Sequence, residues 1–204
     1  QLTKNLSGGF RVEKVSDDNY FSDMSSLISA TSTVNLPQEA NLSYSTDTLD
    51  VNLIAQRYQN LTTTSSPYER LPSLSINHSD EYRNFSGISS YETEVRMSLT
   101  QFERNHNFVA SASQSNTTGT RFVANPSMSI PFETSYGYVK PKLTMNIRSY
   151  ALEGGTTNSK SMTIPTISVD SGIYLDKKLN LAGKDFIQTL EPRIFYSYTP
   201  YKNQ

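Results

Sequence analysis

The sequence contains no cysteine and no tryptophan, and its 204 residues carry a formal net charge of −1. The absence of cysteine excludes a disulfide scaffold and a thiolate metal site within these residues. A near-neutral charge provides no basic surface of the kind that nucleic acids bind, so we expect no nucleic-acid partner. The chain also lacks any apolar run of about 18 residues, which excludes a membrane-spanning helix.

Motifs of catalysis and cofactor binding are missing too. The only two histidines, His78 and His106, stand far apart and have no acidic or thiol ligands beside them in sequence. There is no phosphate-binding loop, no nucleophile elbow and no dinucleotide fingerprint. We therefore expect no metal site, no cofactor, no catalytic residue and no enzymatic activity.

What the sequence does contain is alternation of apolar and polar residues, clearest over residues 138–151. Val139, Leu143, Met145 and Ile147 share one parity, and the other parity includes three basic residues, Lys140, Lys142 and Arg148. Successive side chains of a strand point to opposite faces, so this pattern predicts a strand with one apolar and one basic face. The apolar positions span about ten residues, which is the length of a transmembrane β-strand.

The same alternation recurs along the chain and predicts about nine strands. They are expected at residues 6–16, 28–44, 49–58, 72–77, 93–102, 120–132, 138–151, 162–175 and 188–204. Connections after the odd-numbered strands are long and polar, whereas those after the even-numbered strands, at 45–48, 79–90, 133–136 and 177–186, include tight turns. Long loops on one side and short turns on the other are typical of an outer-membrane barrel, although the asymmetry here is partial.

The predicted fold class is therefore all-β, an antiparallel transmembrane β-barrel segment within a single barrel domain at 1–204. We expect the polar parity to face a hydrated lumen. Its candidate residues are Arg121, Lys140, Lys142, Arg148, Asp170, Glu191 and Arg193. Two interpretations stay open for the basic members: a lumen lining balanced by acidic residues, or a conduit for an anionic head group.

The opposite parity is expected to meet lipid. Its candidates are Leu143, Met145, Ile147, Ile167, Val169 and Ile194, with Tyr196, Tyr198 and Tyr201 as aromatic anchors at the outer membrane interface. Four prolines interrupt runs that otherwise read as central strands: Pro126, Pro141, Pro165 and Pro192. Each removes a ladder donor, and a bulge or a place near the barrel rim would accommodate it.

Several phrases of the sequence resemble the LptD family of lipopolysaccharide-assembly proteins in order and spacing. They are VSDDNYFSD at 15–23, QRYQNL at 56–61, YERLP at 68–72, the pairs NP at 125–126 and IP at 130–131, IP at 164–165 with DSG at 170–172, and TLEPR at 189–193 with PYKNQ at 200–204. The first phrase together with the last pair is specific, and any one of the shorter phrases would be weak.

The resemblance implies a non-enzymatic conduit in the outer membrane of a Gram-negative bacterium, which inserts lipopolysaccharide into the outer leaflet. It also implies an internal part of the barrel domain, with the N-terminal periplasmic domain and further strands lying outside the chain. The implied partners are an LptE-type lipoprotein in the lumen, lipopolysaccharide, the periplasmic Lpt bridge reached through the missing domain, and membrane lipid. The alternatives are a generic porin or adhesin barrel, or a secreted Ser/Thr-rich β-sandwich.

Overall fold

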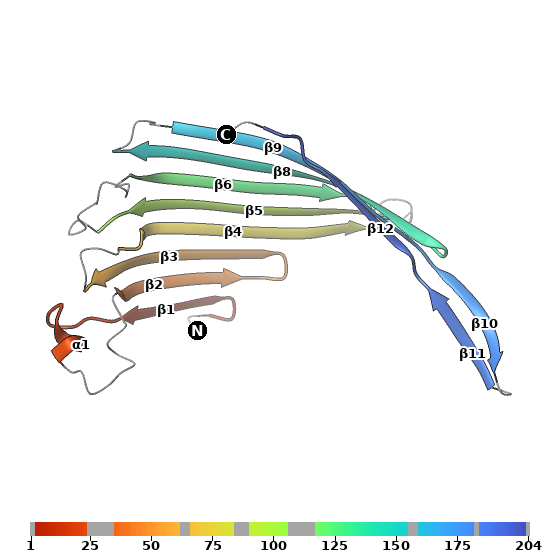
Figure 1. The fold of residues 1–204 in the computed structure, drawn as a ribbon, viewed down its shortest axis with the longest axis horizontal. Helices are drawn as coiled ribbons and strands as arrows, with labels where there is room; N and C mark the ends of the chain where they lie inside the picture. Colours follow the sequence, from red (N-terminus) through yellow and green to blue (C-terminus); the bar gives the residue numbers. More distant parts are fainter. Residues whose placement is uncertain are drawn as a thin grey trace. The chain divides into compact units, whose positions relative to one another are not determined.

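The computed structural model describes residues 3–23, 35–61, 66–83, 90–105, 117–154, 159–181 and 184–202, and almost all of them lie in strands (Figure 1). The strands are β1 (Leu6–Val12), β2 (Asn35–Ser45), β3 (Leu49–Asn60), β4 (Glu69–Arg83), β5 (Ser90–Glu103), β6 (Thr118–Ser129), β7 (Phe132–Thr134), β8 (Gly137–Glu153), β9 (Ser159–Ile173), β10 (Leu175–Leu181), β11 (Lys184–Leu190) and β12 (Arg193–Tyr198). A four-residue helix, α1 (Tyr20–Asp23), follows β1. Among the described residues, no helix has the length and apolarity needed to cross a membrane.

Ten of these strands form one sheet in the order β1-β2-β3-β4-β5-β6-β8-β9-β12, with β7 paired to β8 alone. From β1 to β9, apart from β7, each strand pairs with the next strand along the chain, as the alternating segments of the sequence predict, and β12 pairs with β9. Within the described residues the sheet does not close on itself, because β1 and β12 stand at its two ends. The predicted fold class, an all-β antiparallel barrel segment, is confirmed.

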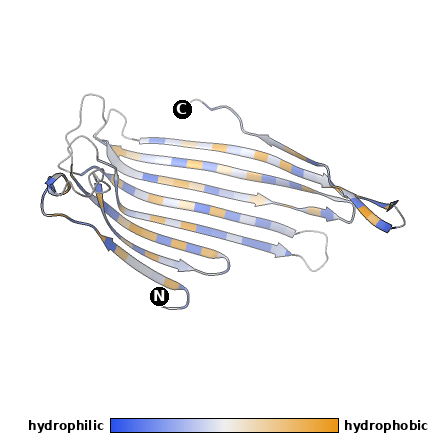
Figure 2. Cartoon of the chain, turned by 60° about the horizontal axis from the view of Figure 1, so that its bottom comes forward, coloured by the Kyte–Doolittle hydropathy of each residue, from blue (hydrophilic) through white to orange (hydrophobic). Residues whose placement is uncertain are grey.

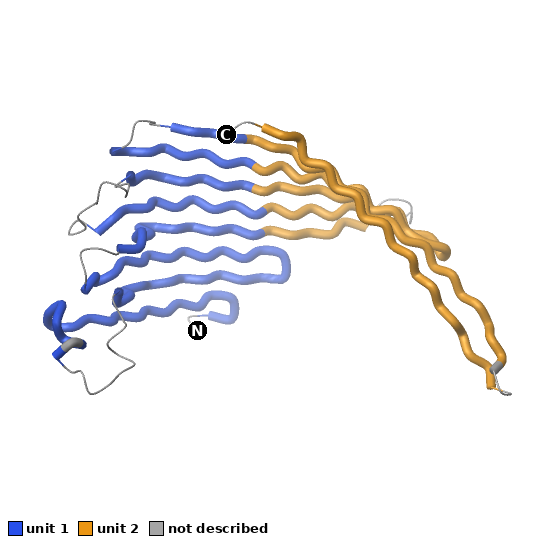
Figure 3. Tube along the Cα trace, in the orientation of Figure 1, with its two compact units in different colours: residues 1–77, 96–124, 147–162 blue, residues 78–95, 125–146, 163–204 orange. Residues whose placement is uncertain are grey.

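The chain divides into two units of contact, coloured separately in Figure 3. Unit 1 comprises residues 1–77, 96–124 and 147–162, and unit 2 comprises residues 78–95, 125–146 and 163–204. In unit 1, β2 and β3 pair from Asn35↔Asn60 to Ser45↔Asp50. Their turn is closed locally, because the Leu49 backbone N–H donates to Thr46 Oγ1 at 3.0 Å.

Unit 2 contains a hairpin that the sequence pattern did not predict. Residues 177–186 were expected to be a connection, but β10 and β11 pair over seven positions as a separate two-stranded sheet. Cross-strand pairs of apolar residues, Leu175 with Leu190 and Leu179 with Phe186, form one face of the hairpin. Lys177 falls in the apolar parity of β10, and this interrupts the alternation that would have revealed the strand.

The prolines mark two kinds of position. Pro126, Pro141 and Pro165 lie inside β6, β8 and β9, where each deprives the ladder of one donor. Pro192 lies between β11 and β12, so the last predicted strand is divided and its in-sheet part begins only at Arg193. Pro192 requires neither a bulge nor a position near the barrel rim, because it lies between two strands, at the point where the pairing of β12 with β9 begins.

Hydrophilic and hydrophobic residues alternate along the strands, as the banding in Figure 2 shows. No large side chain among the described residues is fully buried, and the buried apolar residues there are Leu36 and Ala124. Many large apolar side chains are instead exposed on the sheet, including Leu143 at 48% and Ile167 at 52%. A β-sandwich would cover such a face with a second sheet, and the described residues supply none of that size.

A polar face as the candidate functional site

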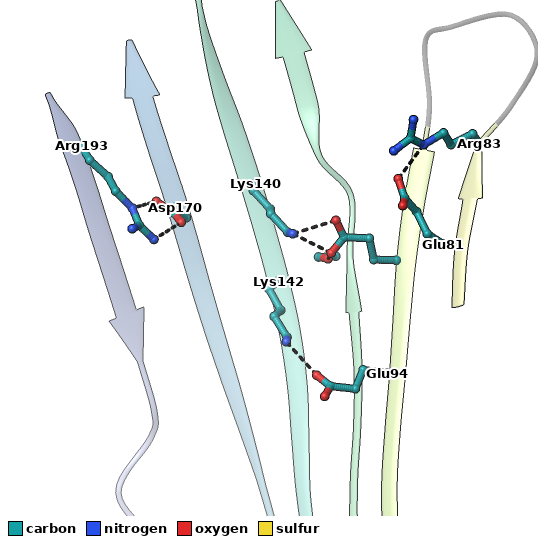
Figure 4. Close-up of polar contacts among 9 residues, drawn as sticks. Glu81, Arg83, Glu94, Lys140, Lys142, Asp170 and Arg193 are labelled. Carbon is teal, nitrogen blue, oxygen red and sulfur yellow. Dashed lines mark hydrogen bonds and ion pairs between the residues drawn. The ribbon is translucent and has the colours of Figure 1, made fainter. Parts of the chain in front are cut away.

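Two lysines and two glutamates form a charged ladder on one face of the sheet in unit 2 (Figure 4). Lys140 Nζ lies 2.6 Å from a Glu92 carboxylate oxygen, and Lys142 Nζ lies 3.4 Å from Glu94 Oε2. The glutamates come from β5 and the lysines from β8, so both pairs reach across the intervening strand β6. We call the side that carries this ladder the polar face and the opposite side the apolar face.

Small residues on β6 make the ladder possible. Ser127 and Ser129 share the polar parity of β6 and are buried beneath the ion pairs. Ser129 Oγ also donates a hydrogen bond of 2.9 Å to Glu92 Oε2. A larger side chain at either position would occupy the space through which Lys140 and Lys142 reach their partners. Because all four charged groups are between a third and two fifths exposed, each pair stabilises the sheet only modestly, by about 1 kcal/mol or less.

A second charged group joins β8, β9 and β12 on the same face. Arg193 binds Asp170 through two guanidinium donors, Nε and Nη2, with Nε 2.7 Å from Asp170 Oδ1 (Figure 4). The Tyr138 hydroxyl donates to the same Asp170 oxygen at 3.2 Å. The Tyr138 ring lies over Gly172, where a Cβ atom would stand 2.7 Å from ring atom Cε1. Glycine is thus the residue that lets the tyrosine lie flat and reach Asp170.

Uncharged polar side chains form a further line of hydrogen bonds, which crosses β8 at Asn146, four residues beyond Lys142. Asn125 Nδ2 donates to Asn146 Oδ1 at 2.8 Å, and Asn146 Nδ2 donates to Thr166 Oγ1 at 3.3 Å. Thr166 and Thr199 share a hydrogen bond of 2.8 Å. One line of polar contacts therefore runs from β6 through β8 and β9 to the residue after β12.

Unit 1 carries its own polar cluster where β3 and β4 meet. Gln56 Nε2 donates to Glu39 Oε2 at 2.9 Å, and Arg70 Nε donates to Gln56 Oε1 at 3.0 Å. Asn105 Nδ2 donates to the backbone oxygen of Tyr58 at 3.0 Å. The sequence phrases QRYQNL and YERLP supply Gln56, Tyr58 and Arg70, so two stretches that resemble the family lie in contact.

An aromatic contact borders that cluster. The Arg104 guanidinium carbon lies 4.2 Å from the centre of the Tyr68 ring, and the Tyr68 and Phe102 rings meet edge to face at 5.6 Å. Arg104 also donates to the backbone oxygen of Ser66. Residue-by-residue alternation gave no signal for these contacts, because they depend on which strand ends become neighbours.

The predicted polar residues divide into three groups. Lys140, Lys142, Asp170 and Arg193 are drawn into ion pairs, as described above. Arg121 and Arg148 share the polar parity of β6 and β8, are exposed, and form no ion pair with another described residue. Glu191 lies outside any strand, in the break between β11 and β12. Glu92, which was not among the predicted site residues, has the parity of Glu94 on β5 and could have been found from it.

The predicted lipid-facing residues occupy the apolar parity of three strands: Leu143, Met145 and Ile147 on β8, Ile167 and Val169 on β9, and Ile194 on β12. Leu143, Ile167 and Ile194 are exposed, and the other three are half-buried between neighbours. Tyr196 and Tyr198 share the parity of Ile194 and are exposed, while Tyr201 follows the strand.

No group of three or more histidine, cysteine, aspartate or glutamate residues in the described ranges could hold a metal ion. His78 lies in β4 and is half-buried, whereas His106 is outside the described residues. The polar face therefore consists of paired charged groups and amides, an arrangement suited to contact with water.

A model of the LptD family, described as LPS transport system D, matches residues 1–204. The chain belongs to the LptD family. It is 36% identical over 208 residues to the LPS-assembly protein LptD of Aromatoleum aromaticum, covering 100% of this chain and 25% of that protein. The LPS-assembly protein LptD of Chromobacterium violaceum is 35% identical over 206 residues, covering 96% of this chain and 24% of that protein.

A third LptD relative, from Thiobacillus denitrificans, is 32% identical over 211 residues and is covered over 27% of its length. This chain therefore spans about a quarter of the length of the curated LptD relatives it matches. The family membership predicted from the sequence phrases is confirmed over the whole chain.

Proposed function

We propose that this chain is part of the wall of a single outer-membrane barrel domain, which serves as the conduit that inserts lipopolysaccharide into the outer leaflet. The observation that carries the proposal is the opposition of the two faces. On β8, Lys140 and Lys142 are tied into a polar ladder while Leu143, one residue on, is exposed to the other side. A sheet with these faces is stable between a hydrated lumen and hydrocarbon.

The rest of the protein completes the barrel in this proposal. Among the described strands, β1 and β12 at the two ends of the sheet leave unpaired backbone groups, which hydrocarbon does not tolerate. Further strands therefore pair with both, and an N-terminal periplasmic domain receives lipopolysaccharide from the Lpt bridge. An LptE-type lipoprotein occupies the lumen. The conduit has no enzymatic activity, and it resides in the outer membrane of a Gram-negative cell.

The polar face supports a lumen role on chemical grounds. Each charged side chain of these ion pairs has a partner of opposite charge, so the surface is hydrophilic but carries little net charge. Arg121 and Arg148 are exposed cations of unit 1 that have the polar parity of β6 and β8, and they are available to anionic sugars or phosphates. We assign the ladder to the lumen lining and these two arginines to transient contacts with the anionic cargo.

Depletion of the full-length protein tests the function. Under depletion, lipopolysaccharide should stop reaching the cell surface, measured by its accessibility to an external modifying enzyme. Re-expression of the full-length protein should restore it, whereas re-expression of an unrelated porin should not. Unchanged surface lipopolysaccharide during depletion would refute the proposal.

A further inference from the structure

An open apolar groove of about 520 Å³ lies on the apolar face of unit 2, where the β10–β11 hairpin joins the sheet. Its lining includes Phe132, Tyr136, Val139, Ile173, Pro192 and Ile194. Val139 is opposite in parity to Lys140, and Phe132 pairs with Val139, so these side chains belong to the apolar face. The volume falls within the range of sites that hold small molecules.

A break in strand pairing creates the groove. Pairing of β9 with β12 ends at Gly172↔Arg193, and pairing of β10 with β11 begins at Leu175↔Leu190. Between them, Pro192 has no N–H to donate, and its carbonyl accepts from the Ile173 N–H at 3.2 Å. The Tyr174 N–H instead donates to the Tyr136 oxygen at 2.8 Å, which holds the β7–β8 turn against the root of the hairpin.

The hairpin continues the apolar face but adds cations to it. Its register places Leu175, Lys177 and Leu179 on one face, opposite Leu190, Gln188 and Phe186. Lys184 also has the parity of this face. Neither lysine forms an ion pair with another described residue, and the acidic residues of the hairpin, Asp176 and Asp185, have the opposite parity. Asp185 is engaged by Asn180 at 2.6 Å.

Cations at the far end of an apolar groove suit a lipid with a charged head. On an extended strand that rises about 3.3 Å per residue, Lys177 stands roughly 13 Å from Ile173. A head-group phosphate at Lys177 would thus leave its acyl chain to run past Leu175 and Leu190 into the groove. Amphipathic segments with basic residues beside apolar ones bind anionic membrane surfaces in this manner.

We propose that this groove and the two lysines bind an anionic diacyl phospholipid of the leaflet at the hairpin end of the barrel. The inference rests on the proposed function, which makes the apolar face lipid-facing. β12 runs from Arg193 beside the hairpin to Tyr198, so the hairpin lies at the end opposite the tyrosines that we assign to the outer interface. The leaflet at the hairpin end is then the phospholipid leaflet, and lipopolysaccharide is not the occupant.

The test uses the full-length protein with its lipoprotein partner in phosphatidylethanolamine vesicles that contain increasing fractions of phosphatidylglycerol. A trace of phosphatidylglycerol with a photoreactive acyl chain is cross-linked, and labelled peptides are identified by mass spectrometry. Label should concentrate on peptides that contain Val139, Ile173 and Ile194. Replacing both lysines, K177Q with K184Q, should lower the apparent affinity roughly fivefold for each lysine, about 25-fold in all.

Lys178→Gln is the matched control, because Lys178 lies on the same hairpin with the opposite parity. It should leave the labelling curve unchanged. Val139→Trp, which fills the groove, should abolish label there without altering the heat-modifiable mobility that reports a folded barrel. Equal labelling of the wild type and the double lysine variant, or preferential labelling by a photoreactive lipopolysaccharide, would overturn the inference.

Delivery of lipopolysaccharide is measured with the same preparations so that the two proposals can fail separately. If lipopolysaccharide is delivered but no label enters the groove, the proposed lipid site is refuted and the proposed conduit stands. If the groove is labelled but the wild-type protein does not deliver lipopolysaccharide, the proposed conduit is refuted and the lipid site stands.

Discussion

At the scale of the residue, neighbours in sequence face opposite environments. Lys142 pairs with Glu94 across β6, Leu143 is exposed on the apolar face, and Thr144 returns to the polar side. Nothing about the backbone distinguishes these three positions, because β8 is regular through all of them. The chemistry of each side chain, and the face on which it falls, decides what a substitution costs.

Leu143→Arg is expected to destabilise the folded full-length protein by about 2–4 kcal/mol, because it places a charge at a position that the proposed function assigns to lipid. Thr144→Arg introduces the same side chain one residue on, toward the polar face, and should cost far less. Lys142→Ala should also have little effect, since its ion pair is substantially exposed. Equilibrium unfolding in lipid vesicles measures all three, and equal losses for Leu143→Arg and Thr144→Arg would show that the faces are wrongly assigned.

At the scale of the element, glycine is required where the backbones of two neighbouring strands lie very close together. Gly119 opens β6 with φ of +152°, and a Cβ there would collide with the Ala151 carbonyl and the backbone of Leu152 on β8. Only glycine meets both conditions at this position. Gly9 on β1 differs, since a Cβ there would meet only the Asn41 side chain, at 2.9 Å from Oδ1.

Gly119→Ala should therefore lower the free energy of unfolding by about 1–3 kcal/mol through strain and loss of β6–β8 pairing. Gly9→Ala serves as the control. It should cost less than about 1 kcal/mol, because the asparagine can rotate away. Urea titration of the two variants in vesicles, followed by heat-modifiable gel mobility, compares them. A larger loss for Gly9→Ala would contradict the packing described for β6 and β8.

Element boundaries show where alternation is informative. The predicted strand at 138–151 corresponds to β8, and that at 49–58 to β3, because long amphipathic runs have one stable pairing. The β10–β11 hairpin escaped prediction because Lys177 breaks the apolar parity. The polar contacts of Gln56 with Arg70 escaped because alternation assigns a face but does not say which side chains meet across strands.

At the scale of the whole molecule, the large sheet is open at both ends of its strand order as far as the described residues extend. β1 and β12 each have one edge that pairs with no other described strand. The described residues also bury little apolar surface against each other, since large side chains stay exposed. Under the proposed function, the stability of this part depends on lipid and on pairing with further strands.

Residues 1–204 produced as an isolated chain should fail to form a heat-modifiable species in detergent or vesicles. Unpaired strand edges and an uncovered apolar face favour aggregation over insertion. The full-length protein, refolded under the same conditions with the lipoprotein partner that we propose, should show the mobility shift. Sedimentation and gel mobility of both preparations measure the outcome, and a monomeric, folded isolated chain would disprove the dependence.

The sequence by itself determined most strands of the large sheet, their two-faced character and the family, because side-chain parity and local phrases are properties of neighbouring residues. It did not determine which charges meet. Only the tertiary structure decided that Lys140 reaches Glu92 over a serine of β6, that Arg193 shares Asp170 with Tyr138, and that a hairpin with a groove at its root replaces a connection. Those outcomes depend on inter-strand register and on where Pro192 stops the ladder, and register is fixed by pairing across the sheet.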